Sequence, residues 1–401
     1  MKAISATLLA SIVGCAFVQP ALAADGGKAK ESVLYSFGSG TDGQYPGAGL
    51  IDVKGTLYGT TERGGTSGNG AVFAVNQKTG KESVLYSFCS QANCADGQYA
   101  GGSLLDVNGT LYGMTEAGGA SGYGTVFSLN PGTGAETVIY SFTGGDTGDG
   151  AYPAGNLIDV NGTLYGTTPN GGTHVKDATG YGIVFAIDST TGKETILHSF
   201  CSNQNCGDGG TPAAGLIDVN GKLYGTTSNG GVNPYAGTVF AYDLKLKSYS
   251  VVYSFCSQSN CTDGDESNAG LIDVNGVLYG TTSMGGTNNM GTVFSVDAKA
   301  GTEKVLYSFC SRSNCADGAN PYASLIDVKG TLYGTTFTSG GVFAVNATTG
   351  KEKVVYTFCS QQGCTDGEDP YGNLIDAKGS LYSTTQKGGS SGFGTVFALK
   401  P

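Results

Sequence analysis

The sequence contains no tryptophan and only two histidines, His174 and His198, in 401 residues. This scarcity leaves little for histidine-based catalysis or for a histidine-rich metal site. Charged residues are also few, at 13%, and the formal net charge is −11. So acidic a chain offers no basic patch for nucleic acid or for an anionic membrane surface. Beyond its N-terminal segment it also has no apolar run long enough to cross a bilayer.

Glycine is abundant, with 69 residues against 10 prolines. Together they make up about a fifth of the chain, which is below the share typical of low-complexity disorder. Hydrophobic residues make up 39% and can build a core. These values predict a folded, glycine-rich and strand-forming protein.

The first 23 residues have the pattern of an export signal. Lys2 is followed by the apolar stretch 3–18 and then by Ala21-Leu22-Ala23, an A-x-A cleavage site. An alternative is a lipoprotein signal, because Ile12-Val13-Gly14-Cys15 resembles a lipobox that would place a lipid on Cys15. We favour cleavage after residue 23, since the apolar stretch continues past Cys15. This predicts a mature chain, 24–401, that is secreted or periplasmic.

Ten cysteines remain without Cys15, and they fall into five pairs with the same C-x4-C spacing. The even count, the constant spacing and the export signal predict five local disulfides in an oxidising compartment. Zinc binding is disfavoured, because the pairs recur singly and without histidine partners. The predicted pairs are Cys89–Cys94, Cys201–Cys206, Cys256–Cys261, Cys310–Cys315 and Cys359–Cys364.

One motif, Leu-(Ile/Leu)-Asp-(Val/Ala)-x-Gly, recurs seven times at spacings of 49 to 59 residues. Each repeat contains four short β-like segments, which in the first repeat are 49–53, 56–61, 71–75 and 83–88. Residues alternate with period two in the last segment, and Asn-Gly or Lys-Gly joins the first two, which favours type I′ hairpin turns. Seven such units predict an all-β fold, a seven-bladed β-propeller with four-stranded blades.

The phase of the repeat predicts how the ring closes. A lone strand, 33–37, precedes the first repeat, and a lone strand, 394–399, ends the last one. If the Leu-Ile-Asp strand is innermost, the last blade lacks its outer strand, and the N-terminal strand takes that place. Such pairing covers two open sheet edges. We therefore expect residues 24–401 to form a single propeller domain that closes without a covalent link.

The repeat resembles the GloVer tandem-repeat family of exported bacterial proteins. The resemblance rests on Leu-Ile-Asp-Val-Lys-Gly-Thr-Leu-Tyr-Gly-Thr-Thr, Gly-Gly, Gly-Ala-Val-Phe-Ala-Val-Asn and Val-Leu-Tyr-Ser-Phe, and it covers essentially the whole mature chain. More loosely, the strands are similar to those of NHL and SMP-30 type propellers. The resemblance implies no general activity. Members often carry a C-terminal anchoring segment, whereas this sequence ends directly after its last strand, which favours a soluble protein.

Three repeated residue types are predicted to be structural. The Asp of Leu-Ile-Asp lies two residues before a tight turn, where its oxygens can accept backbone N–H groups. The seven Leu-Tyr-Gly tyrosines are expected to pack between blades. The Val-Phe phenylalanines are expected to form one recurrent core layer: Phe73, Phe127, Phe185, Phe240, Phe294, Phe343 and Phe397.

Two loop classes share one face of a propeller with this phase: the connections between blades, and the loops between the second and third strands. Asp-Gly recurs in all seven interblade loops, and tyrosines are scattered over both classes. Aromatic rings stack on sugars and carboxylates accept hydroxyl donors, so a site for carbohydrate or for another protein is predicted on this face. The same oxygens also suit Ca²⁺, and plain turn and packing roles stay an alternative. The candidates are Asp42, Tyr45, Asp96, Tyr99, Asp149, Tyr152, Asp208, Asp263, Asp317, Tyr322, Asp366 and Tyr371, with Tyr123, Tyr181 and Tyr235 in the same loops.

Two apparent catalytic motifs carry no chemistry. Residues 38–43 match G-x-G-x-x-G but align with the disulfide loops and precede no helix. Residues 388–392 match G-x-S-x-G but have no following helix and no histidine nearby. The longest second loop, 169–182, holds His174, Lys176 and Asp177, which makes an off-centre site an alternative.

The prediction from these patterns is a monomeric, non-enzymatic binding module with no catalytic residues, no bound metal and no required cofactor. One alternative is a polysaccharide hydrolase or lyase with carboxylates at the central channel, although no pair stands out in the sequence. Another is a purely structural repeat protein.

Overall fold

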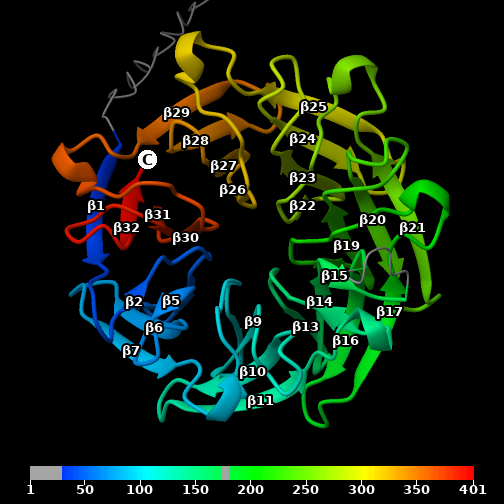
Figure 1. Ribbon diagram of the computed structural model, residues 1–401. Coiled ribbons are helices and arrows are strands. Elements are labelled where there is room, and N and C mark those ends of the chain that lie inside the picture. The colour runs from blue at the N-terminus through cyan, green and yellow to red at the C-terminus, as the bar shows by residue number, and fades with distance from the viewer. Residues whose placement is uncertain (1–28, 174–179) are drawn as a thin grey trace, which may run out of the picture.

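The computed structural model, which describes residues 29–173 and 180–401, shows a closed ring of seven four-stranded antiparallel sheets (Figure 1). These sheets are the blades of a seven-bladed β-propeller, as the repeat predicts. The predicted signal peptide lies outside the described residues. Within the described ranges, no helix has the length and hydrophobicity needed to cross a membrane.

Six blades are built from consecutive strands, with the innermost strand first. Blade 1 consists of β3 (Ile51–Val53), β4 (Thr56–Thr61), β6 (Ala71–Asn76) and β7 (Glu82–Ser87), and blade 2 of β8 (Leu105–Val107), β9 (Thr110–Thr115), β10 (Thr125–Asn130) and β11 (Ala135–Ser141). Blade 3 consists of β13 (Ile158–Val160), β14 (Thr163–Thr168), β16 (Ile183–Asp188) and β17 (Glu194–Ser199), and blade 4 of β18 (Ile217–Val219), β19 (Lys222–Thr227), β20 (Thr238–Asp243) and β21 (Ser248–Ser254). Blade 5 consists of β22 (Ile272–Val274), β23 (Val277–Thr282), β24 (Thr292–Asp297) and β25 (Glu303–Ser308), and blade 6 of β26 (Ile326–Val328), β27 (Thr331–Thr336), β28 (Gly341–Asn346) and β29 (Glu352–Thr357).

The loops contain further short elements. Two small pairings, β2 (Gly43–Gln44) with β5 (Arg63–Gly64) and β12 (Gly150–Ala151) with β15 (Asn170–Gly171), link the two loop classes. Each interblade loop except the first contains a single 3₁₀ turn, among the residues that the structure describes. These turns are η1 (Ala92–Cys94), η2 (Gly145–Thr147), η3 (Gln204–Cys206), η4 (Ser259–Cys261), η5 (Ser313–Cys315) and η6 (Gln362–Cys364).

Blade 7 joins the two ends of the chain. Its order is β30 (Ile375–Ala377), β31 (Ser380–Thr385), β32 (Thr395–Lys400) and then β1 (Lys30–Ser36) on the outside (Figure 1). The pairing runs from Lys30 opposite Lys400 to Ser36 opposite Thr395. The predicted closure is therefore confirmed, with a closing strand that begins at Lys30 rather than Val33.

The inner hairpins turn as predicted. In the first blade, Lys54 and Gly55 both have positive φ, as a type I′ turn requires. The preceding Asp52 accepts the Gly55 N–H at 2.8 Å. The equivalent aspartate does the same in every blade, which confirms its structural role: Asp106, Asp159, Asp218, Asp273, Asp327 and Asp376.

The core consists of seven clusters, one between each pair of neighbouring blades. In each, the Phe that follows an outer strand meets the Val-Phe phenylalanine of the next blade. Phe88 and Phe127 are fully buried, with ring centroids 5.0 Å apart and nearly edge to face. The single layer that the sequence suggests is thus divided among seven interfaces. The Leu-Tyr-Gly tyrosines, such as Tyr58, pack against these same clusters as predicted.

The outer strands depart from the predicted alternation. Val84 pairs with Phe73 but Tyr86 pairs with Val72, so Leu85 lies in a β-bulge. Leu85 and Tyr86 consequently pack against the same cluster. The irregularity recurs at this position in all seven outer strands.

Threonines near the axis connect neighbouring blades. The Thr60 hydroxyl of blade 1 donates to the Gly102 carbonyl of blade 2 at 3.0 Å. Across the closure, Thr384 of blade 7 donates to the Ala48 carbonyl of blade 1 at 2.9 Å. These bonds hold the segments that precede the innermost strands in place around the centre.

Candidate functional site

The predicted aspartates lie within the interblade loops. Asp96 is fully buried, and its carboxylate accepts hydrogen bonds from the Tyr86 hydroxyl at 2.8 Å, from Ser90 N–H and hydroxyl, and from Gln91 N–H. Burial disfavours its charge, but these bonds outweigh that effect and lower the pKa of Asp96. Similar bonding holds Asp149, Asp208, Asp263, Asp317 and Asp366 in buried positions, and Asp42 in a half-buried one.

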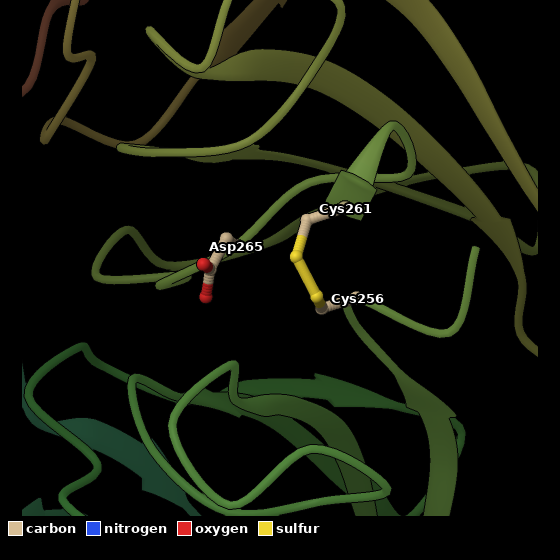
Figure 2. A group of neighbouring side chains, drawn as sticks. All are labelled: Cys256, Cys261 and Asp265. Atoms are coloured by element: carbon tan, nitrogen blue, oxygen red, sulfur yellow. A yellow bond between two sulfur atoms is a disulfide. The ribbon is translucent and has the colours of Figure 1, made fainter. Parts of the chain in front are cut away.

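Five of the loops are closed by disulfides with the predicted pairing. One pair, Cys256 and Cys261, lies beside Asp265, and Figure 2 shows the three side chains together. Thiolates are the form of cysteine that binds metals, and both sulfurs here are held in the S–S bond. The group therefore offers a single carboxylate, which does not make a metal centre.

The predicted tyrosines fall into two registers of the repeat. Tyr45, Tyr99 and Tyr152 occupy the same left-handed position, with φ of 57°, 62° and 56°. They pack against neighbouring loops: the Tyr45 ring lies edge-on to Phe393, and the Arg63 guanidinium lies 4.2 Å above the Tyr99 ring. These three tyrosines do not line the pocket at the ring axis.

Tyr322 and Tyr371 lie two positions later in their repeats, and both line an axial pocket of about 340 Å³. Apart from two glutamates that follow second strands, its lining comes from the segment just before the innermost strand of each of the seven blades, so closure of the ring creates it. Small residues make up much of the wall. The polar side chains are Ser103, Asn156, Asn268, Ser324 and Asn373, together with two glutamates.

The two tyrosines form an aromatic cluster with Phe337 on blades 6 and 7. The Tyr322 and Tyr371 rings are stacked with centroids 5.8 Å apart, and Phe337 meets Tyr322 edge-on at 6.0 Å. Tyr371 is 41% exposed and Phe337 39% exposed. Exposed rings beside a concave polar site provide a stacking surface for a ligand with an apolar face.

Glu62 and Glu116, which the sequence analysis did not single out, line the same pocket from blades 1 and 2. Burial raises the pKa of Glu62, and the charge of Glu116 adds to the rise. Gln386 donates to Glu62 Oε1 at 3.3 Å, and this bond and the charge of Arg63 both oppose the rise in the pKa. The sequence does contain a signal that could have identified these two glutamates. The residue that follows Thr-Thr or Met-Thr at the end of the second strand is Glu in these two repeats alone. The others have Pro169, Ser228, Ser283, Phe337 and Gln386.

One repeat position makes the pocket asymmetric. It is Gly47 in blade 1 and tyrosine in blades 6 and 7, and a Cβ added at Gly47 would lie 2.6 Å from Glu62 Oε1. The glycine therefore leaves room for the glutamate, while the tyrosines fill the neighbouring side. The off-centre alternative with His174, Lys176 and Asp177 lies outside the described residues.

Comparison with known proteins agrees with the repeat. A family model described as the Gloeobacter/Verrucomicrobia repeat matches residues 21–235 and 149–342. The chain belongs to this family. This match confirms the resemblance to the GloVer tandem-repeat family that the sequence of this repeat protein indicates. No curated protein matches its sequence significantly.

Several solved structures are similar to this repeat protein. The extracellular domain of a protein described as a hybrid two-component system from B. thetaiotaomicron has 12% identity and a TM-score of 0.59, over 93% of this chain and 40% of that one. An oligogalacturonate lyase in complex with manganese has 10% identity and a TM-score of 0.56, over 93% and 96%. An oligogalacturonate lyase from Vibrio parahaemolyticus has 9% identity and a TM-score of 0.53, over 93% of each chain. At these identities the likeness shows the propeller fold alone.

Proposed function

We propose that this repeat protein is an exported binding module that holds a carbohydrate in its axial pocket. The observation that carries the proposal is the asymmetry of that pocket, with Tyr322 and Tyr371 stacked on one side and amides, hydroxyls and Glu62 around the rest. A sugar ring presents an apolar C–H face and a hydroxyl edge, which match these two surfaces. Five disulfides and the N-terminal signal pattern support export.

The charges of the pocket favour a neutral sugar or an amino sugar. Glu62 and Glu116 line it, and its lining contains no Lys, Arg or His among the described residues. The nearby cations have partners of their own, since Lys387 Nζ lies 2.9 Å from Asp369 Oδ2 and Arg63 lies over Tyr99. A uronic acid would add a further carboxylate to a negative site, which Coulomb repulsion disfavours. We therefore expect a different ligand class from that named for the two lyases.

Replacing Tyr371 with Ala is expected to weaken binding about 10-fold, because one ring of the stacking surface is lost. The measurement is titration calorimetry with neutral, amino and uronic oligosaccharides that a glycan array has identified. Tyr152→Ala is the matched control, because Tyr152 is 36% exposed but does not line the pocket. An array without any bound glycan, or equal losses in both variants, would count against the proposal.

A second candidate is a glycan-cleaving enzyme, which the environment of Glu62 favours. A carboxyl group with a raised pKa can deliver a proton to a leaving oxygen, while a second carboxylate such as Glu116 serves as base or nucleophile. Glycoside hydrolysis commonly uses two carboxyl groups that flank the scissile bond, and this pocket supplies two glutamates.

For this candidate, Glu62→Gln is expected to lower turnover at least 100-fold while oligosaccharide binding persists, because the amide cannot release a proton. Release of reducing ends and of unsaturated sugar products are the two assays, since they separate hydrolysis from elimination. Glu368→Gln, on an exposed loop, serves as control. If the unmutated protein releases neither product from any glycan that it binds, the enzymatic candidate is rejected and the binding module stands.

A further inference from the structure

A carboxyl group that the axial site does not use recurs at six of the seven blade junctions. It belongs to a glutamate near the start of the outer strand in every blade except blade 4. One of its oxygens, Oε1, is buried without a hydrogen-bond partner among the described residues. An ionised carboxylate in such a place is costly. The six residues are Glu31, Glu82, Glu136, Glu194, Glu303 and Glu352.

Each glutamate faces a tyrosine and an aspartate of the preceding blade. At the junction of blades 1 and 2, Glu136 faces Tyr86 and Asp96, whose hydroxyl and carboxylate are 2.8 Å apart. The Tyr86 hydroxyl gives its hydrogen to Asp96, so its oxygen can accept one from a donor. A protonated Glu136 is a donor, whereas an ionised one is not. The other sets are Glu31–Tyr356–Asp366, Glu82–Tyr35–Asp42, Glu194–Tyr140–Asp149, Glu303–Tyr253–Asp263 and Glu352–Tyr307–Asp317.

The electrostatic environment agrees with a retained proton. Burial raises the pKa of Glu136 to about 7, the charge of Asp96 adds to the rise, and Tyr86 opposes it. Burial and the facing aspartate also raise the pKa to about 7 at four other junctions: those of Glu31, Glu82, Glu194 and Glu303. At the sixth, burial raises the pKa of Glu352, and the Arg312 guanidinium 2.6 Å away opposes the rise.

The seventh junction, between blades 3 and 4, exchanges two members of the set together. His198 takes the place of the tyrosine, and Tyr249 takes the place of the glutamate. His198 Nε2 lies 3.0 Å from Asp208 Oδ2, and the Tyr249 ring stacks on the imidazole with centroids 3.7 Å apart. The Tyr249 hydroxyl donates to the Asp208 carbonyl. At this junction the glutamate is therefore missing together with the tyrosine that it faces elsewhere. This joint replacement links the glutamate carboxyl group to the hydroxyl of that tyrosine.

We propose that the six glutamic acids are proton-dependent contacts between blades, each donating to the tyrosine of the preceding blade when protonated and loosening the ring when ionised. Because their folded pKa lies above the unfolded value, the stability they add is fully present below about pH 4.5 and is lost as pH rises, through about 7 at the five junctions other than that of Glu352. The lowered pKa of Asp96 has the opposite sign, since its stability is lost as pH falls below about 4. The ring is thus expected to be most stable near pH 5.

Thermal unfolding of the full chain, followed by circular dichroism, tests the proposal. The Tm is expected to be about 10 °C higher at pH 5 than at pH 8. Glu136→Gln keeps a donor without a charge, so it is expected to raise the Tm at pH 8 and to leave it nearly unchanged at pH 5. Glu368→Gln is the matched control, because it removes one charge from the chain's net −11 at an exposed position.

An infrared measurement on the unmutated protein needs no variant to fold. Difference spectra between pH 5 and pH 8 are expected to show loss of the C=O band of protonated carboxyl groups over the range in which the Tm falls. A Tm that stays level or rises from pH 5 to pH 8 overturns the proposal. The proposal is also overturned if the rise in Tm at pH 8 is no larger for Glu136→Gln than for Glu368→Gln.

Discussion

Removal of residues 24–38 is expected to abolish the folded ring. β1 supplies the outer strand of blade 7, and without it the long edge of β32 is open. The cluster between blades 7 and 1 would lose Leu34, Tyr35 and the fully buried Phe37. Loss of one buried Phe alone costs about 3–5 kcal/mol. The whole strand therefore contributes an amount comparable to the about 5–15 kcal/mol by which a domain is stable.

Circular dichroism and size-exclusion chromatography of the truncated chain measure this effect. We expect loss of the cooperative melting transition, and its recovery when a peptide of residues 24–38 is added, because the closure is non-covalent. Phe37→Ala in the full chain should lower the Tm but leave the ring closed. A truncated chain with an unchanged Tm would show that the ring does not depend on this strand.

Asp96→Ala is expected to cost about 3–5 kcal/mol of unfolding free energy. Its carboxylate is the common acceptor for the Tyr86 hydroxyl, for Ser90 and for the Gln91 N–H. Asp96 itself is fully buried, so removing it leaves a buried gap and takes the shared acceptor from all these donors, which is more costly than losing one exposed bond. Asp96→Asn keeps one carbonyl oxygen and should cost less.

Chemical denaturation of Asp96→Ala, beside Asp52→Ala, measures the cost. Asp52 is exposed and accepts one bond from Gly55, so its loss is expected to cost about 1 kcal/mol or less. Glycan affinity of folded Asp96→Ala should match the unmutated protein, because Asp96 does not line the axial pocket. Unchanged stability with lost binding would instead make the loop aspartates the ligand residues that the sequence analysis predicted.

Local patterns were enough to predict most of the ring. The repeat predicts seven blades, the lone strands at each end predict the closure by β1, and the constant spacing predicts the five disulfides. These features depend on residues close in sequence or on strand pairing between chain ends, which period and turn chemistry specify. The alternation of the outer strands failed at Leu85, because a bulge changes the side that a residue faces.

The repeat sequence accounts for the scaffold of this protein, because each blade uses the same short-range rules of strand, turn and buried ring. It does not indicate that Gly47, Glu62, Tyr322 and Tyr371 share one pocket. The first two are separated from the two tyrosines by most of the chain, and the two pairs converge only when blade 7 meets blade 1. The pairing of Glu136 with Tyr86 and Asp96 likewise requires two blades packed side by side, since the burial that alters a carboxyl group is created by the interface itself.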